Sequence, residues 1–113
     1  TTDDGSIGVK GVVSEALDVH LSLSRIDPER VVVFCCGPDP MMRAVSTLAI
    51  ERGVTCQVCL EQAMACGMGT CQSCVVKLRN GKAPSDRAAG ADWHFRLDCT
   101  DGPVFRADQV IWD

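Results

Sequence analysis

The first sixty residues alternate between helical and strand patterns of hydrophobic positions. In residues 11–24 the apolar side chains recur mainly at helical spacing, which predicts a helix. Residues 31–35 form a continuous apolar run rich in β-branched residues, which is typical of a strand buried on both faces. A second helical segment follows, and residues 54–60 are again strand-like. This order predicts a right-handed strand–helix–strand unit from a nucleotide-binding sheet.

The second helix has recognisable ends. Asp39 and Pro40 suit the N-cap and the first helical position, and Gly53 suits the C-terminal stop. Its buried face should carry the apolar residues that recur at helical spacing, namely Met41, Val45, Leu48 and Ala49.

The residues between the first strand and this helix are candidates for ligand contacts. Cys36, Gly37 and Pro38 directly follow the strand. Glycine lets the backbone come close to a ligand, and ligands of such sheets bind at the carboxyl ends of the strands. For Cys36 two interpretations stay open: a thiol that shapes this site, or a cysteine that packs under the turn.

After residue 60 the pattern changes to a glycine-rich loop with three cysteines. Cys66, Cys71 and Cys74 form a C-x4-C-x2-C array, and Cys99 follows later. This is the plant-type ferredoxin spacing, in which four thiolates hold a [2Fe–2S] cluster. Residues 74–78 and 93–97 are strand-like, the second with half-buried alternation, and residues 104–112 form a closing apolar run. We therefore expect one unit at residues 1–60 and a small, mainly β unit at residues 61–113.

Composition restricts the class of protein. The net charge of −4 and the pI near 5.0 argue against nucleic acid and anionic membranes as partners, and no apolar run is long enough to span a bilayer. Eight cysteines suit either a secreted disulfide scaffold or a reduced metal site, and their clustering favours the metal site and a cytoplasmic location. Because Thr1 is not an initiator methionine, we expect a fragment or a processed chain.

Zinc is the rival metal. Paired C-x2-C knuckles are typical of zinc ribbons, but a ribbon would leave Cys66 and Cys99 unused and would ignore the glycines beside Cys66. We expect the cysteines outside the iron–sulfur spacing to be mainly buried small hydrophobes. The knuckles of the zinc alternative are Cys56 with Cys59 and Cys71 with Cys74.

Three motifs together resemble one family. They read Cys-Gly-Pro-x-Pro-Met-Met from residue 36, Leu-Glu-x-x-Met-Ala-Cys-Gly from residue 60, and Cys-x-Asp-Gly-Pro-Val-Phe from residue 99. In this order they resemble the iron–sulfur electron-transfer subunit of bacterial dihydroorotate dehydrogenase, a relative of ferredoxin reductases. The resemblance covers nearly the whole chain but only the C-terminal part of such a subunit.

The resemblance implies an electron path. In that family dihydroorotate reduces FMN in a separate catalytic subunit, and electrons pass through the [2Fe–2S] cluster to FAD and then to NAD. The chain would be a non-catalytic, electron-transferring part of this oxidoreductase. An FAD-binding barrel and a pyrophosphate turn would precede Thr1, so we expect this chain to hold no FAD and at most half of an NAD site.

Residue roles follow from the same resemblance. The cysteines matching the family ligands are Cys66, Cys71, Cys74 and Cys99. The segment Cys36, Gly37 and Pro38 would lie beside the nicotinamide, and the loop Asp4, Gly5 and Ser6 resembles a region that lines the nucleotide site.

The chain departs from the family in three places. Cys59 stands where serine is more common, and Cys35 adds a second thiol before Cys36. The gap between Cys74 and Cys99 is longer than the family pattern, with the extra length expected in residues 82–92.

Two other redox proteins remain as alternatives. One is the small subunit of an NADH-dependent ferredoxin:NADP or sulfide reductase, but there the first ligand is usually aspartate, so Cys66 favours the dihydroorotate enzyme. The other is a free ferredoxin-like carrier, which would have no use for the Cys-Gly-Pro turn.

Overall fold

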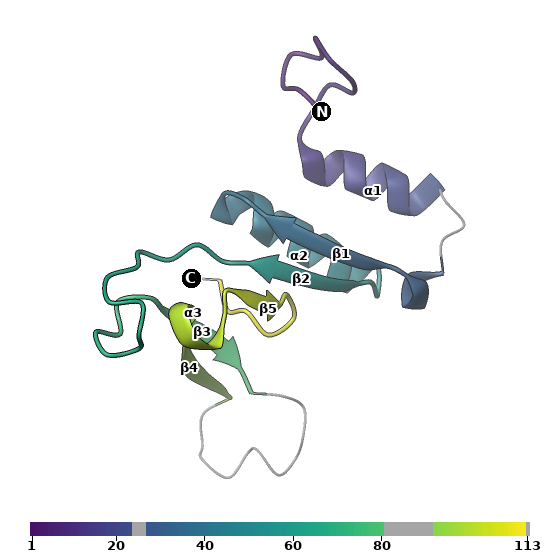
Figure 1. The fold of residues 1–113 in the computed structure, drawn as a ribbon. Helices are drawn as coiled ribbons and strands as arrows, with labels where there is room; N and C mark the ends of the chain where they lie inside the picture. Colours follow the sequence, from purple (N-terminus) through teal and green to yellow (C-terminus); the bar gives the residue numbers. More distant parts are fainter. Residues whose placement is uncertain (24–26, 81–91, 113) are drawn as a thin grey trace.

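The computed structural model describes residues 1–23, 27–80 and 92–112, and the fold is mixed α/β (Figure 1). Residues 82–91 of the expected insertion lie outside the described residues. No helix within the described ranges is long and apolar enough to cross a bilayer. In chain order the elements are α1 (Val13–Leu23), the 3-10 helix η1 (Pro28–Arg30), β1 (Val32–Cys36), α2 (Asp39–Glu51), β2 (Thr55–Cys59), β3 (Val75–Arg79), β4 (Trp93–Leu97), α3 (Asp98–Asp101) and β5 (Val104–Arg106).

The predicted strand–helix–strand unit is present. β1 and β2 are parallel neighbours, and α2 connects them. β5 adds an antiparallel strand on the other edge of β2, so the sheet order is β1-β2-β5. β3 and β4 form a separate antiparallel pair. The closing run is therefore a strand only at β5, and Val110 then makes an isolated bridge to Leu78, which connects the chain end to the second sheet.

The C-terminal end of α2 has the predicted glycine stop. Gly53 has φ +67°, which glycine adopts without the strain of a side chain. Its N–H donates to the carbonyl of Ile50, and the N–H of Val54 donates to Ala49, the pair of bonds that defines a Schellman motif. The predicted N-terminus is wrong by one residue: α2 begins at Asp39, and Pro38 is the N-cap.

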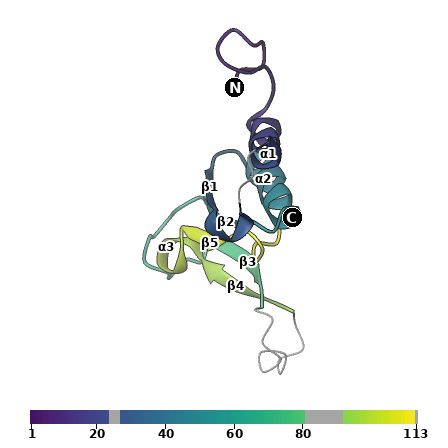
Figure 2. The same ribbon diagram turned by 90° about the vertical axis from the view of Figure 1, so that its right-hand side faces the viewer.

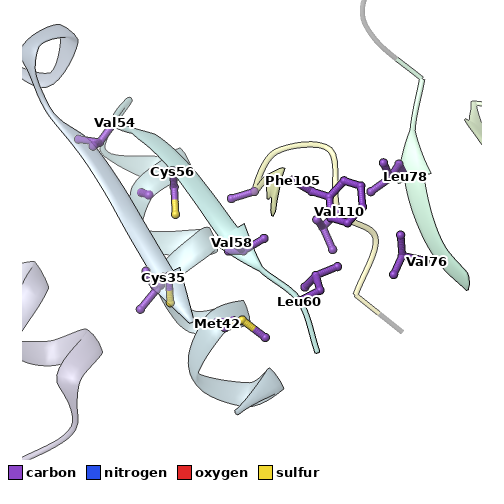
Figure 3. Close-up of a cluster of buried hydrophobic side chains, with 13 residues drawn as sticks. Cys35, Met42, Val54, Cys56, Val58, Leu60, Val76, Leu78, Phe105 and Val110 are labelled. Carbon is purple, nitrogen blue, oxygen red and sulfur yellow. The ribbon is translucent and has the colours of Figure 1, made fainter. Parts of the chain in front are cut away.

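A single hydrophobic core connects both sheets (Figure 3). The buried face of α2 is rotated from the predicted one: Met42 and Ser46 lie inside, whereas Met41 and Leu48 are only half-buried. Ser46 is tolerated there because its hydroxyl donates to the carbonyl of Met42, at 2.7 Å. The core consists of Cys35, Met42, Val45, Ala49, Val54, Cys56, Val58, Leu60, Val76, Leu78, Phe105, Ala107 and Val110.

The prediction that β1 is buried on both faces is wrong. Both long helices lie on one side of β1 and β2 (Figure 2), where α2 packs on the sheet and α1 packs on α2. Arg52, the C-cap residue of α2, also forms an ion pair with Asp18 of α1. No element in the described ranges covers the other face, so Val32 and Phe34 are exposed, Phe34 by 74%.

The predicted alternation of β4 is present, but its apolar side faces outward. Val76 and Leu78 of β3 point into the core, and the register pairs them with the polar Arg96 and His94. Trp93 and Phe95 therefore lie on the exposed face, where their rings meet edge to face with centroids 4.9 Å apart. The Lys77 ammonium lies 4.4 Å from the centre of the Trp93 ring. At this distance the ammonium and the face of the indole ring attract each other in a cation–π interaction.

Candidate metal centre

Three of the four candidate ligands lie on the long loop between β2 and β3 (Figure 1). The loop turns at Gly67, with φ +65°, and at Gly69, with φ +80°, where glycine avoids the steric cost of a side chain. A side chain at Gly69 would also press on α3, because its Cβ would lie 3.3 Å from Cγ2 of Thr100 and 3.5 Å from Cδ1 of Leu97. Gly69 thus lets the loop lie directly against the helix that carries Cys99.

The backbone of the loop points N–H groups at the first thiol. The amides of Met68 and Cys71 donate to Sγ of Cys66, at 3.5 and 3.4 Å respectively. Hydrogen bonds of this kind stabilise a thiolate and help to set the potential of a bound iron–sulfur cluster. The glycine turns therefore orient polar backbone groups toward sulfur as well as bending the chain.

Cys71 has a polar neighbour that sequence reasoning missed. Its Sγ lies 3.2 Å from the hydroxyl of Ser73, which itself donates to the carbonyl of Ala63, at 3.2 Å. Hydrogen bonds from Ser73, followed by those from Cys66, lower the pKa of the exposed Cys71 thiol to about 6. No motif indicates this role, because a serine between two cysteines is ordinary in a polar loop.

Strand register brings the fourth candidate to the loop. Leu97 of β4 pairs with Val75 of β3, and one residue further the N–H of Asp98 donates to the carbonyl of Cys74, at 2.9 Å. Cys99 comes next, in α3, where its thiol lies near that of Cys74. The neighbouring Cys74 thiol, followed by burial, raises the pKa of Cys99.

Asp98 is a second residue that the sequence analysis missed. It is 2% exposed, and its Oδ1 has no hydrogen-bond partner within the described part of the chain. Burial raises the pKa of its carboxyl, while a hydrogen bond from the Gln62 backbone acts in the opposite direction. Asp98 therefore connects the start of the cysteine loop to α3.

The four thiols fall into two neighbouring pairs. The N–H of Cys71 donates to Sγ of Cys66, at 3.4 Å, and Cys99 lies beside Cys74. Four neighbouring thiolates are the donor set of a thiolate-bound metal or iron–sulfur centre, so these side chains suit such a group. Among the described residues, no group of three or more His, Cys, Asp or Glu has an arrangement that would hold a metal ion as it stands.

The structure separates the two knuckles of the zinc alternative. Cys56 is buried in β2, where burial, followed by the neighbouring Cys35, raises its pKa, and Cys59 contacts Cys36 rather than the loop thiols. The geometry therefore favours the loop and α3 over a ribbon as the thiol-rich site.

The predicted nucleotide-binding segments belong to neither the cysteine loop nor α3. Cys36 is exposed at the end of β1, and Gly37 and Pro38 connect it to α2. In the N-terminal loop, Oδ1 of Asp4 accepts from the N–H of Ser6, at 3.0 Å, which lowers the pKa of Asp4. Of the two segments only Pro38 lines the apolar hollow of about 450 Å³ beside them, together with Asp3, the neighbour of the second segment. The other residues predicted to bind the nucleotide do not line it, namely Cys36, Gly37, Asp4, Gly5 and Ser6.

A thiol-rich loop that packs on a small helix is the arrangement of a thiolate-bound centre, and comparison with known proteins shows what this chain resembles. Residues 61–111 match the family described as the iron–sulfur cluster binding domain of dihydroorotate dehydrogenase B. Over 112 residues the chain is 37% identical to the dihydroorotate dehydrogenase B (NAD(+)) electron transfer subunit of Caldanaerobacter subterraneus subsp. tengcongensis, covering 99% of this chain and 39% of that subunit. It is 38% identical to the corresponding subunit of Desulforamulus reducens, covering 38% of it. The predicted family resemblance is confirmed, and the chain spans under half of these relatives.

A solved structure supports the same relationship. It is the NADH-dependent reduced ferredoxin-NADP oxidoreductase, a protein studied for flavin-based electron bifurcation. It is 32% identical to this chain and superimposes with a TM-score of 0.70, covering 96% of this chain and 33% of the other. The fold is thus that of a ferredoxin-reductase relative.

Proposed function

We propose that this chain is the C-terminal part of an electron-transfer subunit, and that Cys66, Cys71, Cys74 and Cys99 hold a [2Fe–2S] cluster. When bound, such a cluster supplies one-electron transfer. The observation that carries the proposal is the packing of the cysteine loop on α3, far apart in sequence: the N–H of Asp98 donates to the carbonyl of Cys74, and a Cβ at Gly69 would lie 3.3 Å from Thr100. The match of residues 61–111 to a cluster-binding domain supports it.

The chain's own residues would have distinct tasks in this site. The four thiolates would bind the irons, and the amides of Met68 and Cys71 would donate to the Cys66 sulfur. Cys74 is 2% exposed and the other ligands are more open, so one side of the site would be shielded and the other would face a partner. That open side is where electrons would enter or leave.

Residues 1–60 would be the C-terminal half of a Rossmann-like nucleotide-binding domain, and residues 61–113 the cluster-binding domain. The parallel β1–α2–β2 unit supports the first assignment, because ligands of such sheets bind at the carboxyl ends of the strands. There Cys36, Gly37 and Pro38 would approach the nicotinamide of NAD, and the loop of Asp4, Gly5 and Ser6 would border the same nucleotide. FAD would be bound by the longer subunit.

The partner we propose is an FMN-containing dihydroorotate dehydrogenase catalytic subunit, in a cytoplasmic hetero-oligomer that passes electrons to FAD and NAD. The names of the curated relatives support this assignment. A second candidate is the corresponding part of an NADH-dependent ferredoxin-NADP reductase, which the TM-score of 0.70 favours. In both cases the chain relays electrons for a flavoprotein.

The first experiment is metal and sulfide analysis of one anaerobic sample, with visible and reduced-state EPR spectra. We expect two irons and two sulfides per chain and a rhombic EPR signal on reduction. Zinc without sulfide would overturn the proposal. If the protein is isolated without metal, it is reconstituted with iron and sulfide, and failure to bind them would overturn the proposal as well.

A second experiment distinguishes the partners. The reduced, cluster-loaded chain is mixed anaerobically with the FMN subunit of a bacterial dihydroorotate dehydrogenase, and reoxidation is followed in the visible spectrum. We expect faster electron transfer than to an unrelated flavoprotein of similar potential. Equal rates would argue against the dihydroorotate enzyme and for the second candidate.

A further inference from the structure

Two thiols outside the metal centre face each other across the parallel strands. Cys36, the last residue of β1, is the direct register partner of Cys59, the last residue of β2. Register partners on neighbouring strands point to the same side of a sheet, so the two thiols lie side by side. The sheet therefore presents a dithiol at the carboxyl ends of its strands.

The same strands carry a second thiol pair that makes a useful contrast. Cys35 and Cys56 lie on the opposite face, packed in the core with 9% and 5% of their surfaces exposed. Cys36 is exposed and Cys59 is half-exposed. Of the four cysteines in β1 and β2, only Cys36 and Cys59, the outer pair, are therefore accessible to a reagent in solution.

The geometry suits a covalent bond between the outer thiols. Neighbouring strands lie about 4.8 Å apart, within the roughly 4.4–6.8 Å that separates the Cα atoms of disulfide-linked cysteines. Both residues end their strands, but their backbones differ. Gly37 follows Cys36 with φ +151°, whereas Cys59 pairs with Val104 of β5 and the next N–H, of Leu60, donates to Pro103. The small adjustment that an S–S bond requires would therefore be made on the Cys36 side.

We propose that Cys36 and Cys59 form a redox-active dithiol that reacts with a low-molecular-weight disulfide, such as oxidised glutathione, to give an intrachain disulfide. The exposed Cys36 thiolate attacks one sulfur of the small disulfide, which forms a mixed disulfide and releases one glutathione thiolate. The Cys59 thiolate then attacks the Cys36 sulfur and releases the second. Two protein thiols are oxidised, one disulfide is reduced to two thiols, and their protons balance.

The surroundings of Cys59 assign the order of these steps. Burial, followed by Cys36 and by the carboxylates of Asp98 and Glu61, raises the pKa of the Cys59 thiol. The more open Cys36 is thus the first to meet the oxidant, and Cys59 resolves the mixed disulfide. The bond would join β1 to β2 beside the Cys-Gly-Pro segment.

The test exposes the cluster-loaded chain to anaerobic glutathione buffers of increasing oxidised fraction. Remaining thiols are then alkylated, and the peptides are mapped by mass spectrometry. We expect a linked Cys36–Cys59 peptide to accumulate while the visible spectrum of the metal centre stays constant. In Cys59→Ser the link should be lost and a glutathione adduct should remain on Cys36, whereas Cys56→Ser should form the link as the wild type does.

Several results would overturn the proposal. The two thiols could stay free in every buffer, Cys36 could retain glutathione in the wild type, or the linked peptides could contain Cys35 or a loop cysteine. Bleaching of the metal centre before the link appears would show that the loop thiols are the ones oxidised. If Cys59→Ser fails to fold by circular dichroism, the peptide map of the wild type and of Cys56→Ser still decides the question.

Discussion

The eight cysteines divide into two sets that the fold treats differently. The set at Cys66, Cys71, Cys74 and Cys99 lies on irregular backbone and one short helix, where amides point at the Cys66 sulfur and a serine hydroxyl lies beside the Cys71 sulfur. The set at Cys35, Cys36, Cys56 and Cys59 lies in two regular parallel strands, whose amides are used in the strand ladder.

The difference shows how backbone type determines what a thiol can do. In the loop, the side chain of Ser73 and then backbone N–H groups free of the ladder favour a thiolate, and the pKa of Cys71 falls to about 6. In the sheet the main influence is burial, and the pKa of Cys56 rises to about 11. A thiol in the loop is therefore suited to bind metal, whereas a thiol inside the sheet behaves as a small hydrophobe.

The strongest test of this division removes one thiol from each set. We expect Cys71→Ser to lose nearly all visible absorbance of the metal centre, because one of four ligands is missing. Cys59→Ser should keep the full spectrum. Both are measured on anaerobically reconstituted protein with matched iron and sulfide contents. Full absorbance in Cys71→Ser would refute the ligand assignment, and loss in Cys59→Ser would restore the zinc-ribbon ligand set.

A second test compares the stability that each region contributes. Met42 has no exposed surface in the core, whereas Met68 of the loop is 73% exposed. We expect Met42→Ala to lower the free energy of unfolding by about 2–5 kcal/mol because it leaves a cavity. Met68→Ala should change it by less than about 0.5 kcal/mol. Urea denaturation of both variants is the measurement, and equal losses would show that the loop is part of the stabilising core.

The positions of the helices and strands of residues 1–60 could be predicted from the sequence, but the way these elements pack on one another could not. Hydrophobic spacing located α1, α2, β1 and β2, because each is determined by neighbours in the chain. The buried face of α2 was assigned to Met41 rather than Met42, since the choice depends on how the helix lies on the sheet.

The same reasoning applies to the candidate site. The C-x4-C-x2-C spacing drew attention to the loop, and the contact of Cys99 with Cys74 agrees with that prediction. Asp98 escaped notice because its burial depends on the β3–β4 register, and the contact between Cys36 and Cys59 depends on strand adjacency. Neither the burial of Asp98 nor the pairing of Cys36 with Cys59 follows from the local sequence around these residues. The ligand set itself stays a prediction.

A third test uses pH on the buried sheet thiol. Burial, followed by the nearby Cys35, raises the pKa of Cys56 to about 11, so at pH 8 only about one thiol in a thousand is ionised. We expect iodoacetamide to label Cys56 far more slowly than the exposed Cys36, with a rate that rises about tenfold per pH unit. Mass spectrometry of timed samples gives both rates, and equal rates would contradict the burial.

The raised pKa of Cys56 also makes the free energy of unfolding depend on pH. An unfolded cysteine ionises from about pH 8.5, whereas folded Cys56 keeps its proton until about pH 11. The folded state then binds more protons than the unfolded one, so Cys56 lowers the free energy of unfolding as pH rises through this window. Cys56→Ala should weaken that decline in urea titrations at pH 8.5 and above.

The smallest expected effect tests how the loop is held to α3. Gly67 and Gly69 both have positive φ, but only Gly69 faces close neighbours: a Cβ there would lie 3.3 Å from Thr100, whereas one at Gly67 would meet nothing within 4 Å. Alanine at either site should cost about 1–2 kcal/mol of backbone strain. Gly69→Ala should cost more, and should also speed loss of iron to a chelator, because it pushes the loop away from Cys99. Equal iron loss in the two variants would mean that Cys99 is positioned by the β3–β4 register alone, without help from the packing of the loop.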